Sequence, residues 1–361
     1  MDKKKIGIIF GGKSGEHEVS LLSAASVIRA IDKEKFELHY IGITRQGRWM
    51  EVPKILGRDI DGERDITADI IEKGSWEKAA KEFNPGELKG RIDFALPVMH
   101  GPYCEDGKIQ GLFEMLDIPY GGCGVLASAV AMDKALSKKI FEMEGLPVCR
   151  YELLTRRDVK GSLDAAAQRI EKSLGYPCFV KPANMGSSVG VSKAADRQQL
   201  KEALNLALEY DKRIIVEEFI DCREIETAVL GNDSPQAAAV GEILPSAEFY
   251  DYNAKYCDGG ASKLCIPADI SEEAATRIRE MALKAYMAID GEGFARVDFF
   301  IDKKTGKIYL NEINTIPGFT KYSMFPLLWE AAGVKYGKTI ERIVEIGYER
   351  YYAENSGQTV L

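Results

Sequence analysis

Histidine is scarce in this chain, and its cysteines are scattered. There are three histidines and seven cysteines among 361 residues, and no two cysteines form a CxxC pattern. Closely spaced histidines and cysteines are typical of zinc sites, and an even number of cysteines in a short secreted chain is typical of a disulfide framework. The sequence therefore predicts neither kind of stabilisation.

Long apolar runs, low-complexity tracts, repeats and an excess of positive charge are also missing. No run approaches the ~20 residues of a membrane-spanning helix, and Met1–Lys5 leads into a strand without a signal-peptide pattern. The formal net charge is −8, which argues against a general nucleic-acid or membrane-surface binder. We therefore expect a cytoplasmic protein of two or three domains, with no membrane and no nucleic-acid partner.

What the chain does contain is an opening β-α-β pattern. Lys5–Phe10 and Phe36–Ile43 are apolar strand runs, and residues 19–31 carry apolar side chains at helical spacing. Residues 93–99 predict another strand, whereas residues 58–90 predict loops and one helix. This alternation indicates a parallel sheet flanked by helices, with ligands beyond the carboxyl ends of the strands.

The rest of the chain alternates between strands and helices less regularly. Helices are expected from Met132 to Gly145 and over 271–289 and 334–353, and strands over 177–182, 214–220 and 225–230. Residues 246–262 predict a long loop. Loops of this length are uncommon and are often functional.

A hairpin near the C-terminus carries the clearest chemical pattern. Its strands contain Arg296 and Asp298, then Glu312 and Asn314, separated by the polar turn Asp302–Gly306. Alternate side chains share one face of a strand, so pairing would gather all four polar groups. A solvated polar face fits poorly, because the intervening residues are apolar. Carboxylates beside substrate phosphates suit Mg²⁺, so we predict a metal-phosphate site.

Two other segments could contact phosphate. Gly7–Ser14 satisfies the P-loop pattern GxxxxGK[ST], but its spacer residues are strand core, so we interpret the match as accidental. Gly186–Ser188 follows Lys181 at a strand end; this arrangement fits phosphate binding and an ordinary hairpin turn equally well. Glu217 and Glu224 could read an adenine amine and a ribose hydroxyl, or could simply be solvated.

Six segments together resemble one family. They are Glu16–Ser20, His100–Gly107, Met132–Lys134, Lys181–Gly190, Phe249–Tyr256 and Asn311–Gly318. Their order and spacing are similar to those of the D-alanine–D-alanine ligases of the ATP-grasp superfamily, over nearly the whole chain. The resemblance implies an α/β fold of three domains. These are an N-terminal parallel-sheet domain (1–130) and two domains that clasp ATP (131–225 and 226–361), with a lid at 246–262.

The resemblance also implies residue roles for ATP and metal. ATP would lie between the second and third domains, against Lys134, Lys181, Ser188, Glu217, Glu218, Phe219, Ile220, Glu224 and Lys255. Two Mg²⁺ or Mn²⁺ ions would be held by Asp298, Glu312 and Asn314, in agreement with the hairpin pattern.

The implied reaction joins two D-alanine molecules through a D-alanyl phosphate, for peptidoglycan synthesis. Glu16, Ser187 and Tyr256 match the contacts of the first D-alanine, and Ser323 and Met324 those of the second. His100 would orient the first substrate or serve only as a structural histidine. Arg296 and the N–H of Gly318 would form the oxyanion hole. The family also implies a homodimer.

Some residues depart from the family pattern. Cys104 stands where a glycine is common, and Lys321-Tyr322 replaces a more usual Ser-His pair. Tyr256 favours D-alanine, since relatives that use D-lactate carry other residues there. Three alternatives stay open: a D-alanine–D-serine or other D-alanyl ligase, a P-loop regulator that depends on Lys13, and an inert amino-acid-binding module.

Overall fold

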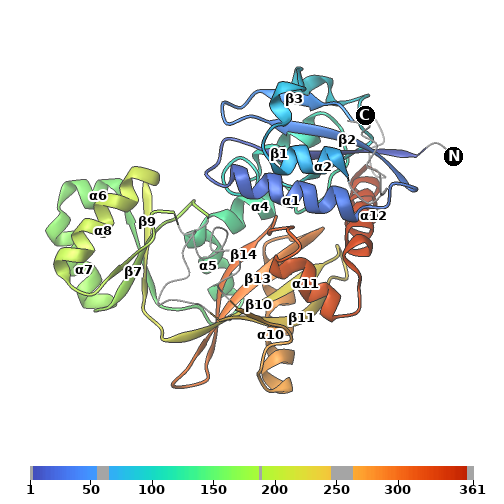
Figure 1. Cartoon of the computed structure of the whole chain (residues 1–361). Coiled ribbons are helices and arrows are strands. Elements are labelled where there is room, and N and C mark those ends of the chain that lie inside the picture. Colours follow the sequence, from blue (N-terminus) through green and yellow to red (C-terminus); the bar gives the residue numbers. More distant parts are fainter. Residues whose placement is uncertain (1–2, 55–64, 187–188, 245–262, 356–361) are drawn as a thin grey trace.

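The computed structural model describes residues 3–54, 65–186, 189–244 and 263–355, which form three sheets (Figure 1). The first sheet has the order β4-β3-β2-β1-β5. Its strands are β1 (Lys4–Gly11), β2 (Phe36–Ile43), β3 (Trp49–Val52), β4 (Lys81–Glu82) and β5 (Phe94–Pro97). β1 runs parallel to β2 and β5, as the β-α-β pattern predicted. The short turn between Thr44 and Arg48 reverses the chain, so β3 and β4 extend the sheet in antiparallel fashion.

Helices cover this sheet. They are α1 (His17–Ala30), α2 (Ile66–Glu72) and α3 (Lys108–Met115), with short 3-10 turns at Trp76–Lys78 and Pro85–Leu88. Gly7 lies inside β1, paired with His39 and Ala95, and the next three residues are completely buried. The apparent P-loop is therefore strand core. The Nζ of Lys13 instead lies 5.3 Å from the centre of the Tyr103 ring.

The second sheet is antiparallel, with the order β6-β9-β7-β8. Its strands are β6 (Tyr151–Thr155), β7 (Cys178–Pro182), β8 (Ser192–Ala194) and β9 (Arg213–Glu218). Its helices are α6 (Arg156–Gly161), α7 (Leu163–Ser173) and α8 (Arg197–Tyr210). Side chains of Thr155, Ser162 and Asp196 cap the first turns of these helices, which fixes where each begins.

The third sheet is also antiparallel, with the order β12-β11-β10-β13-β14. Its strands are β10 (Cys222–Leu230), β11 (Gln236–Leu244), β12 (Lys263–Cys265), β13 (Phe294–Asp302) and β14 (Ile308–Asn314). Packed with it are α4 (Val125–Met132), α5 (Lys134–Met143) and α10 (Glu272–Ala288). The boundary expected at residue 225 falls inside β10, which pairs with β13 along its whole length.

Of two further helices, α11 (Met324–Ala331) packs on β10 and β11 of the third sheet, and α12 (Tyr336–Asn355) returns to the first sheet (Figure 1). Ile340, Ile343 and Val344 of α12 share one apolar core with the strands of that sheet. Arg350 is 4% exposed and donates to the carbonyl of Gly122 over 2.6 Å. Helix α12 is thus part of the first domain's core.

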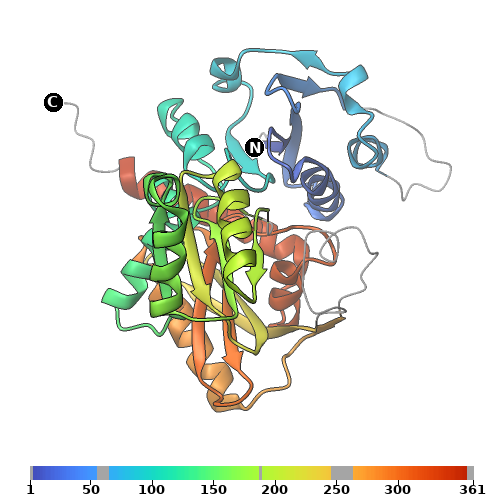
Figure 2. The ribbon, with the colours of Figure 1, turned by 90° about the vertical axis from the view of Figure 1, so that its left-hand side faces the viewer.

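Figure 2 shows the second sheet with its helices in front of the strands of the third. A cleft between these two sheets is where the resemblance placed ATP. No helix in the described ranges has both the length and the apolar character needed to cross a membrane.

Candidate active site

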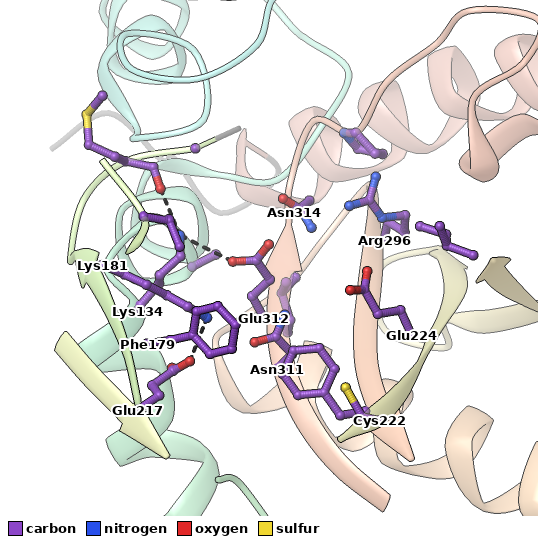
Figure 3. Close-up of a pocket in the computed structure, with 18 of the residues that line it drawn as sticks. Lys134, Phe179, Lys181, Glu217, Cys222, Glu224, Arg296, Asn311, Glu312 and Asn314 are labelled. Atoms are coloured by element: carbon purple, nitrogen blue, oxygen red, sulfur yellow. Dashed lines mark hydrogen bonds and ion pairs between the residues drawn. The ribbon is translucent and has the colours of Figure 1, made fainter. Parts of the chain in front are cut away.

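A cavity of about 810 Å³ lies between the second and third sheets and reaches the first domain (Figure 3). It is lined by most of the predicted residues: Glu16, His100, Lys134, Lys181, Glu217, Glu218, Phe219, Ile220, Glu224, Arg296, Glu312, Asn314 and Gly318. Three predicted residues lie outside this lining: Asp298, Ser323 and Met324. Four others are outside the described residues: Ser187, Ser188, Lys255 and Tyr256.

The polar face of the hairpin forms one wall. Asp298 lies opposite Glu312, and Arg296 lies opposite Asn314, so all four project from the same face. Arg296 donates from Nε and Nη2 to the two oxygens of Asp298, each over 2.7 Å. Its Nε is also 2.9 Å from Glu226 Oε2. Two carboxylates therefore fix the guanidinium.

The same wall fits a hard metal ion. Asp298 also accepts a hydrogen bond from the side-chain amide of Asn314 over 2.9 Å. An amide and a carboxylate, both possible metal ligands, therefore lie side by side. Glu312 Oε2 lies 3.2 Å from Lys134 Nζ. Cations thus balance both carboxylates, and oxygen ligands of this kind are those that Mg²⁺ takes beside phosphates. Within the described ranges no group of three or more His, Cys, Asp or Glu gathers. Mg²⁺ bound by one or two carboxylates usually takes its other ligands from water and substrate phosphates.

Lys134 connects this wall to the opposite side. It begins α5, and its Nζ donates to the carbonyl of Met185 over 2.8 Å. Asp133 caps the helix through the amides of Ala135 and Leu136 and also pairs with Arg213 of β9. The start of α5 is therefore joined to the second sheet.

A buried group of charges lies below the opposite wall. Lys181 Nζ is 2.5 Å from one oxygen of Glu217, and Lys138 Nζ is 3.1 Å from the other. Burial alone would raise the pKa of Glu217, but the two lysines lower it to about 2. Both oxygens of this carboxylate face lysines, and its expected contact with an adenine amine stays a prediction.

An apolar slot lies at the far end of this wall. The rings of Phe179 and Phe219 stack at 6.0 Å, and Lys193 Nζ lies 4.5 Å above Phe219. Glu218 pairs with Arg150, because Arg150 Nε donates to Glu218 Oε2 over 2.7 Å. A flat aromatic surface followed by lysines suits a nucleobase followed by phosphates.

The end of the cavity nearest the first domain holds two carboxylates. A Cβ placed on Gly101 would lie 2.7 Å from Glu16 Oε2, and one on Gly186 would lie within 4 Å of both Glu16 and Glu105. Burial and the charge of Glu16 raise the pKa of Glu105 to about 8. Glu105 is therefore largely protonated at neutral pH.

His100 links two segments of this wall through its two ring nitrogens. Its Nδ1 lies 3.2 Å from the carbonyl of Ile316, which requires the proton on Nδ1, so Nε2 accepts from the hydroxyl of Ser23 over 3.0 Å. Burial lowers the pKa of His100. The ring thus stays neutral, and the amide of Phe319 also donates to Ser23 Oγ. Together these bonds fix the loop that carries Gly318.

Gly318 lies against Ser323, because a Cβ at Gly318 would be 2.7 Å from Ser323 Oγ. That hydroxyl also accepts from the amide of Thr320 over 3.0 Å. The side chain of Met324 is 5% exposed and belongs to the apolar core. Only the Ser323 hydroxyl of this predicted pair is therefore close to the cavity wall.

Sequence reasoning did not single out Phe179 and Glu105, which line the cavity, or Lys138 and Glu226, which pair with lining residues. Glu105 lay within the His100–Gly107 segment, and Glu226 alternates with Glu224 on β10. Lys138 follows Lys134 by one helical turn, the spacing that puts two side chains on one side of a helix. Each signal was present but weak until tertiary partners were known.

Comparison with known proteins identifies the family. Residues 5–123 match the family described as "D-ala D-ala ligase N-terminus", and residues 140–345 match "D-ala D-ala ligase C-terminus". The D-alanine–D-alanine ligase of Ruminiclostridium cellulolyticum is 51% identical over 97% of both chains. That of Acetivibrio thermocellus is 48% identical, again over 97% of both.

Solved structures agree. The VanG D-Ala:D-Ser ligase of Enterococcus faecalis has a TM-score of 0.83 and 37% identity, covering 96% of this chain and 100% of its own. The D-alanine–D-alanine ligase of Coxiella burnetii has a TM-score of 0.81 and 31% identity, covering 99% and 97%. With its ATP-grasp fold and a lysine-lined cavity between two sheets, the chain belongs to the D-alanine–D-alanine ligase family.

Proposed function

We propose that this protein joins two D-alanine molecules to D-alanyl-D-alanine with ATP, for peptidoglycan precursor synthesis. One observation carries the proposal beyond family membership. The cavity places an arginine and a carboxylate-amide face opposite two lysines, with an aromatic slot at one end and a carboxylate at the other. These groups suit, in turn, metal and phosphate, a nucleobase and an ammonium ion.

The first step transfers the γ-phosphoryl group. A carboxylate oxygen of the first D-alanine forms a bond to phosphorus, the bond from phosphorus to the ADP oxygen breaks, and ADP leaves. Two anions must meet, so their repulsion has to be neutralised. Lys134 and Lys181 supply positive charge from one wall, while Glu16 is placed to receive the ammonium of this substrate.

Asp298, Glu312 and Asn314 would hold Mg²⁺ or Mn²⁺ bound with the nucleotide. When bound, such ions neutralise phosphate charge and orient the reacting group. Arg296 contacts Asp298 and Lys134 contacts Glu312, so positive charge lies beside two of these three residues.

The second step forms the peptide bond. The neutral amine of the second D-alanine attacks the acyl carbon, the carbon–oxygen bond to phosphate breaks, and the proton lost by the nitrogen leaves with inorganic phosphate. Arg296 and the N–H of Gly318 are proposed to stabilise the oxyanion. Water must be excluded to protect the acyl phosphate. The lid at 246–262 and the roles of Ser187, Ser188, Lys255 and Tyr256 remain predictions, outside the described residues.

A second acceptor has a specific observation in its favour. The structural similarity to a ligase described as D-Ala:D-Ser supports D-serine as an alternative second substrate. The residues expected to discriminate, around Tyr256, are outside the described part of the chain. The acceptor has therefore to be decided by product analysis.

The test is phosphate release from Mg-ATP, with products identified by mass. D-alanine alone should give the dipeptide, and L-alanine should give none. Turnover only with D-alanine plus D-serine or D-lactate would show that D-alanine is not the second substrate. Lys181→Met should abolish turnover while Lys13→Ala should not; the reverse result would favour the P-loop reading. No turnover with any pair, despite ATP binding, would contradict the proposal.

We also propose a cytoplasmic homodimer, supported by the family resemblance. Light scattering on the purified protein should give twice the 40.0 kDa chain mass. A stable monomer with full activity would contradict the homodimer.

A further inference from the structure

Lys138 is a buried lysine that the reaction as described does not use. It lies on α5 and is 1% exposed, with Nζ 3.1 Å from Glu217 Oε1 and 3.4 Å from Cys149 Sγ. It does not line the cavity, whereas Glu217 and Lys181 do. Burying an ammonium group is costly unless it is well paired, so its presence calls for an account.

The charges at this point are two lysines and one carboxylate. Lys181 and Lys138 each face one oxygen of Glu217, and Glu217 is 2% exposed. Water therefore does little to stabilise this carboxylate, which depends on its two lysines. The only one of the three that has the reach and position to meet a phosphate is Lys181, at the cavity wall.

A phosphate bound by Lys181 competes with Glu217 for its ammonium group. If Lys181 were the only counter-ion, this competition would leave a buried carboxylate incompletely paired, which is unfavourable. Lys138 remains in place and keeps the carboxylate paired. We propose that Lys138 is a positioning residue that frees Lys181 for the polyphosphate of ATP by holding the charge of Glu217.

This inference rests on the proposed function, because it assumes that the cavity binds ATP. It assigns Lys138 no contact with substrate. Its effect should therefore depend on the phosphates of the ligand and should vanish when Glu217 carries no charge. A purely structural lysine would show neither dependence.

The experiment measures binding of adenosine, ADP and ATP by calorimetry to the full-length protein and to Lys138→Met. The methionine keeps an unbranched side chain one atom shorter than lysine and removes the charge. We expect ATP affinity to fall about tenfold or more and adenosine affinity to change less than twofold. Lys139→Met is the matched control, since Lys139 is the exposed neighbour on the same helix and should bind all three ligands normally.

A second pair of variants tests the mechanism. With Glu217→Gln there is no carboxylate to hold, so adding Lys138→Met should change ATP affinity less than threefold. This comparison stays decisive if Lys138→Met alone does not fold. In a folded single variant, an equal loss for adenosine and ATP would overturn the proposal, as would ATP affinity unchanged within twofold.

The proposal for Lys138 would also be overturned if the double variant bound ATP more than threefold more weakly than Glu217→Gln alone. Failure of the inference is separable from failure of the proposed function. If the parent protein forms D-alanyl-D-alanine but Lys138→Met binds ATP normally, only the inference fails. If the parent binds no ATP at all, the proposed function fails as well.

Discussion

Arg296 is held on its hairpin by Asp298 and Glu226, so its guanidinium is fixed before any substrate arrives. A fixed donor stabilises a developing oxyanion without reorganisation. Removing one typically lowers kcat by about 10²–10³-fold. We expect Arg296→Met to lower kcat by this factor while the protein stays folded.

Steady-state kinetics with circular dichroism would check the Arg296 prediction. Arg342→Met, on the exposed face of α12, is the matched control and should retain parental kcat. A loss confined to the KM for D-alanine would instead assign Arg296 to uniform substrate binding.

Glu105 makes stability depend on pH. Its pKa is about 8 in the folded chain, raised by burial and by Glu16 from an ordinary value of 4.5. Between pH 4.5 and 8 the folded state holds a proton that the unfolded state has lost, so stability falls as pH rises through this window. Glu105→Gln should flatten this part of the profile and be more stable than the parent at pH 8.

Urea denaturation of the ligand-free protein at pH 5, 6, 7 and 8 would measure this effect. Asp106→Asn, at the neighbouring residue that pairs with Lys108, should leave the slope unchanged. Parallel profiles for parent and Glu105→Gln would show that Glu105 is ionised in the fold across this range.

At the scale of elements, α5 joins two sheets. Its first residue bonds to Ala183 after β7 through the main chain, and Phe141 near its end is buried in the core of the third sheet. Asp133, 3% exposed, caps the helix and pairs with Arg213. Asp133→Ala would leave that arginine without its partner, and we expect a loss of about 3–5 kcal/mol in the free energy of unfolding.

Chemical denaturation would test the Asp133 prediction against Asp158→Ala. Asp158 completes an exposed capping box on α6, where losing a cap costs about 0.5–2 kcal/mol. Equal losses in the two variants would mean that Asp133 acts as a cap alone.

Elements defined by local pattern could be predicted from the sequence. Alternation and the polar turn predicted that β13 and β14 pair and share one polar face. Asp302 accepts from the amides of Lys304 and Thr305 and closes the turn locally. That β10 belongs to the third sheet could not be predicted from the sequence, since no composition change marks the loop between β9 and β10. Glu226 was missed for a related reason: its partner Arg296 lies seventy residues further along the chain.

At the scale of the whole molecule, α12 fastens the C-terminal end to the first sheet. A Cβ on Gly347 would lie 2.5 Å from the carbonyl oxygen of Tyr120 and 2.7 Å from the ring of Phe94. Helix propensity favours alanine over glycine by about 1 kcal/mol, but a clash with backbone cannot be relieved by a rotamer change. We expect Gly347→Ala to be destabilising overall, by about 1–3 kcal/mol.

Thermal and urea unfolding would show whether Gly347→Ala lowers or raises the stability of the protein. Gly161→Ala is the control, because a Cβ there meets nothing within 4 Å and the change should be neutral or stabilising. A stabilised Gly347→Ala protein would mean that α12 shifts easily on the first sheet.

The docking of α12 also bears on how the chain folds during synthesis. Phe94 is made early, whereas Gly347, which packs on it, follows about 250 residues later. At about 5–20 residues per second, the interval is on the order of ten to fifty seconds. Throughout that time the nascent first domain exposes an apolar surface to chaperones and to neighbouring chains. The first domain to leave the ribosome is therefore among the last to complete its core.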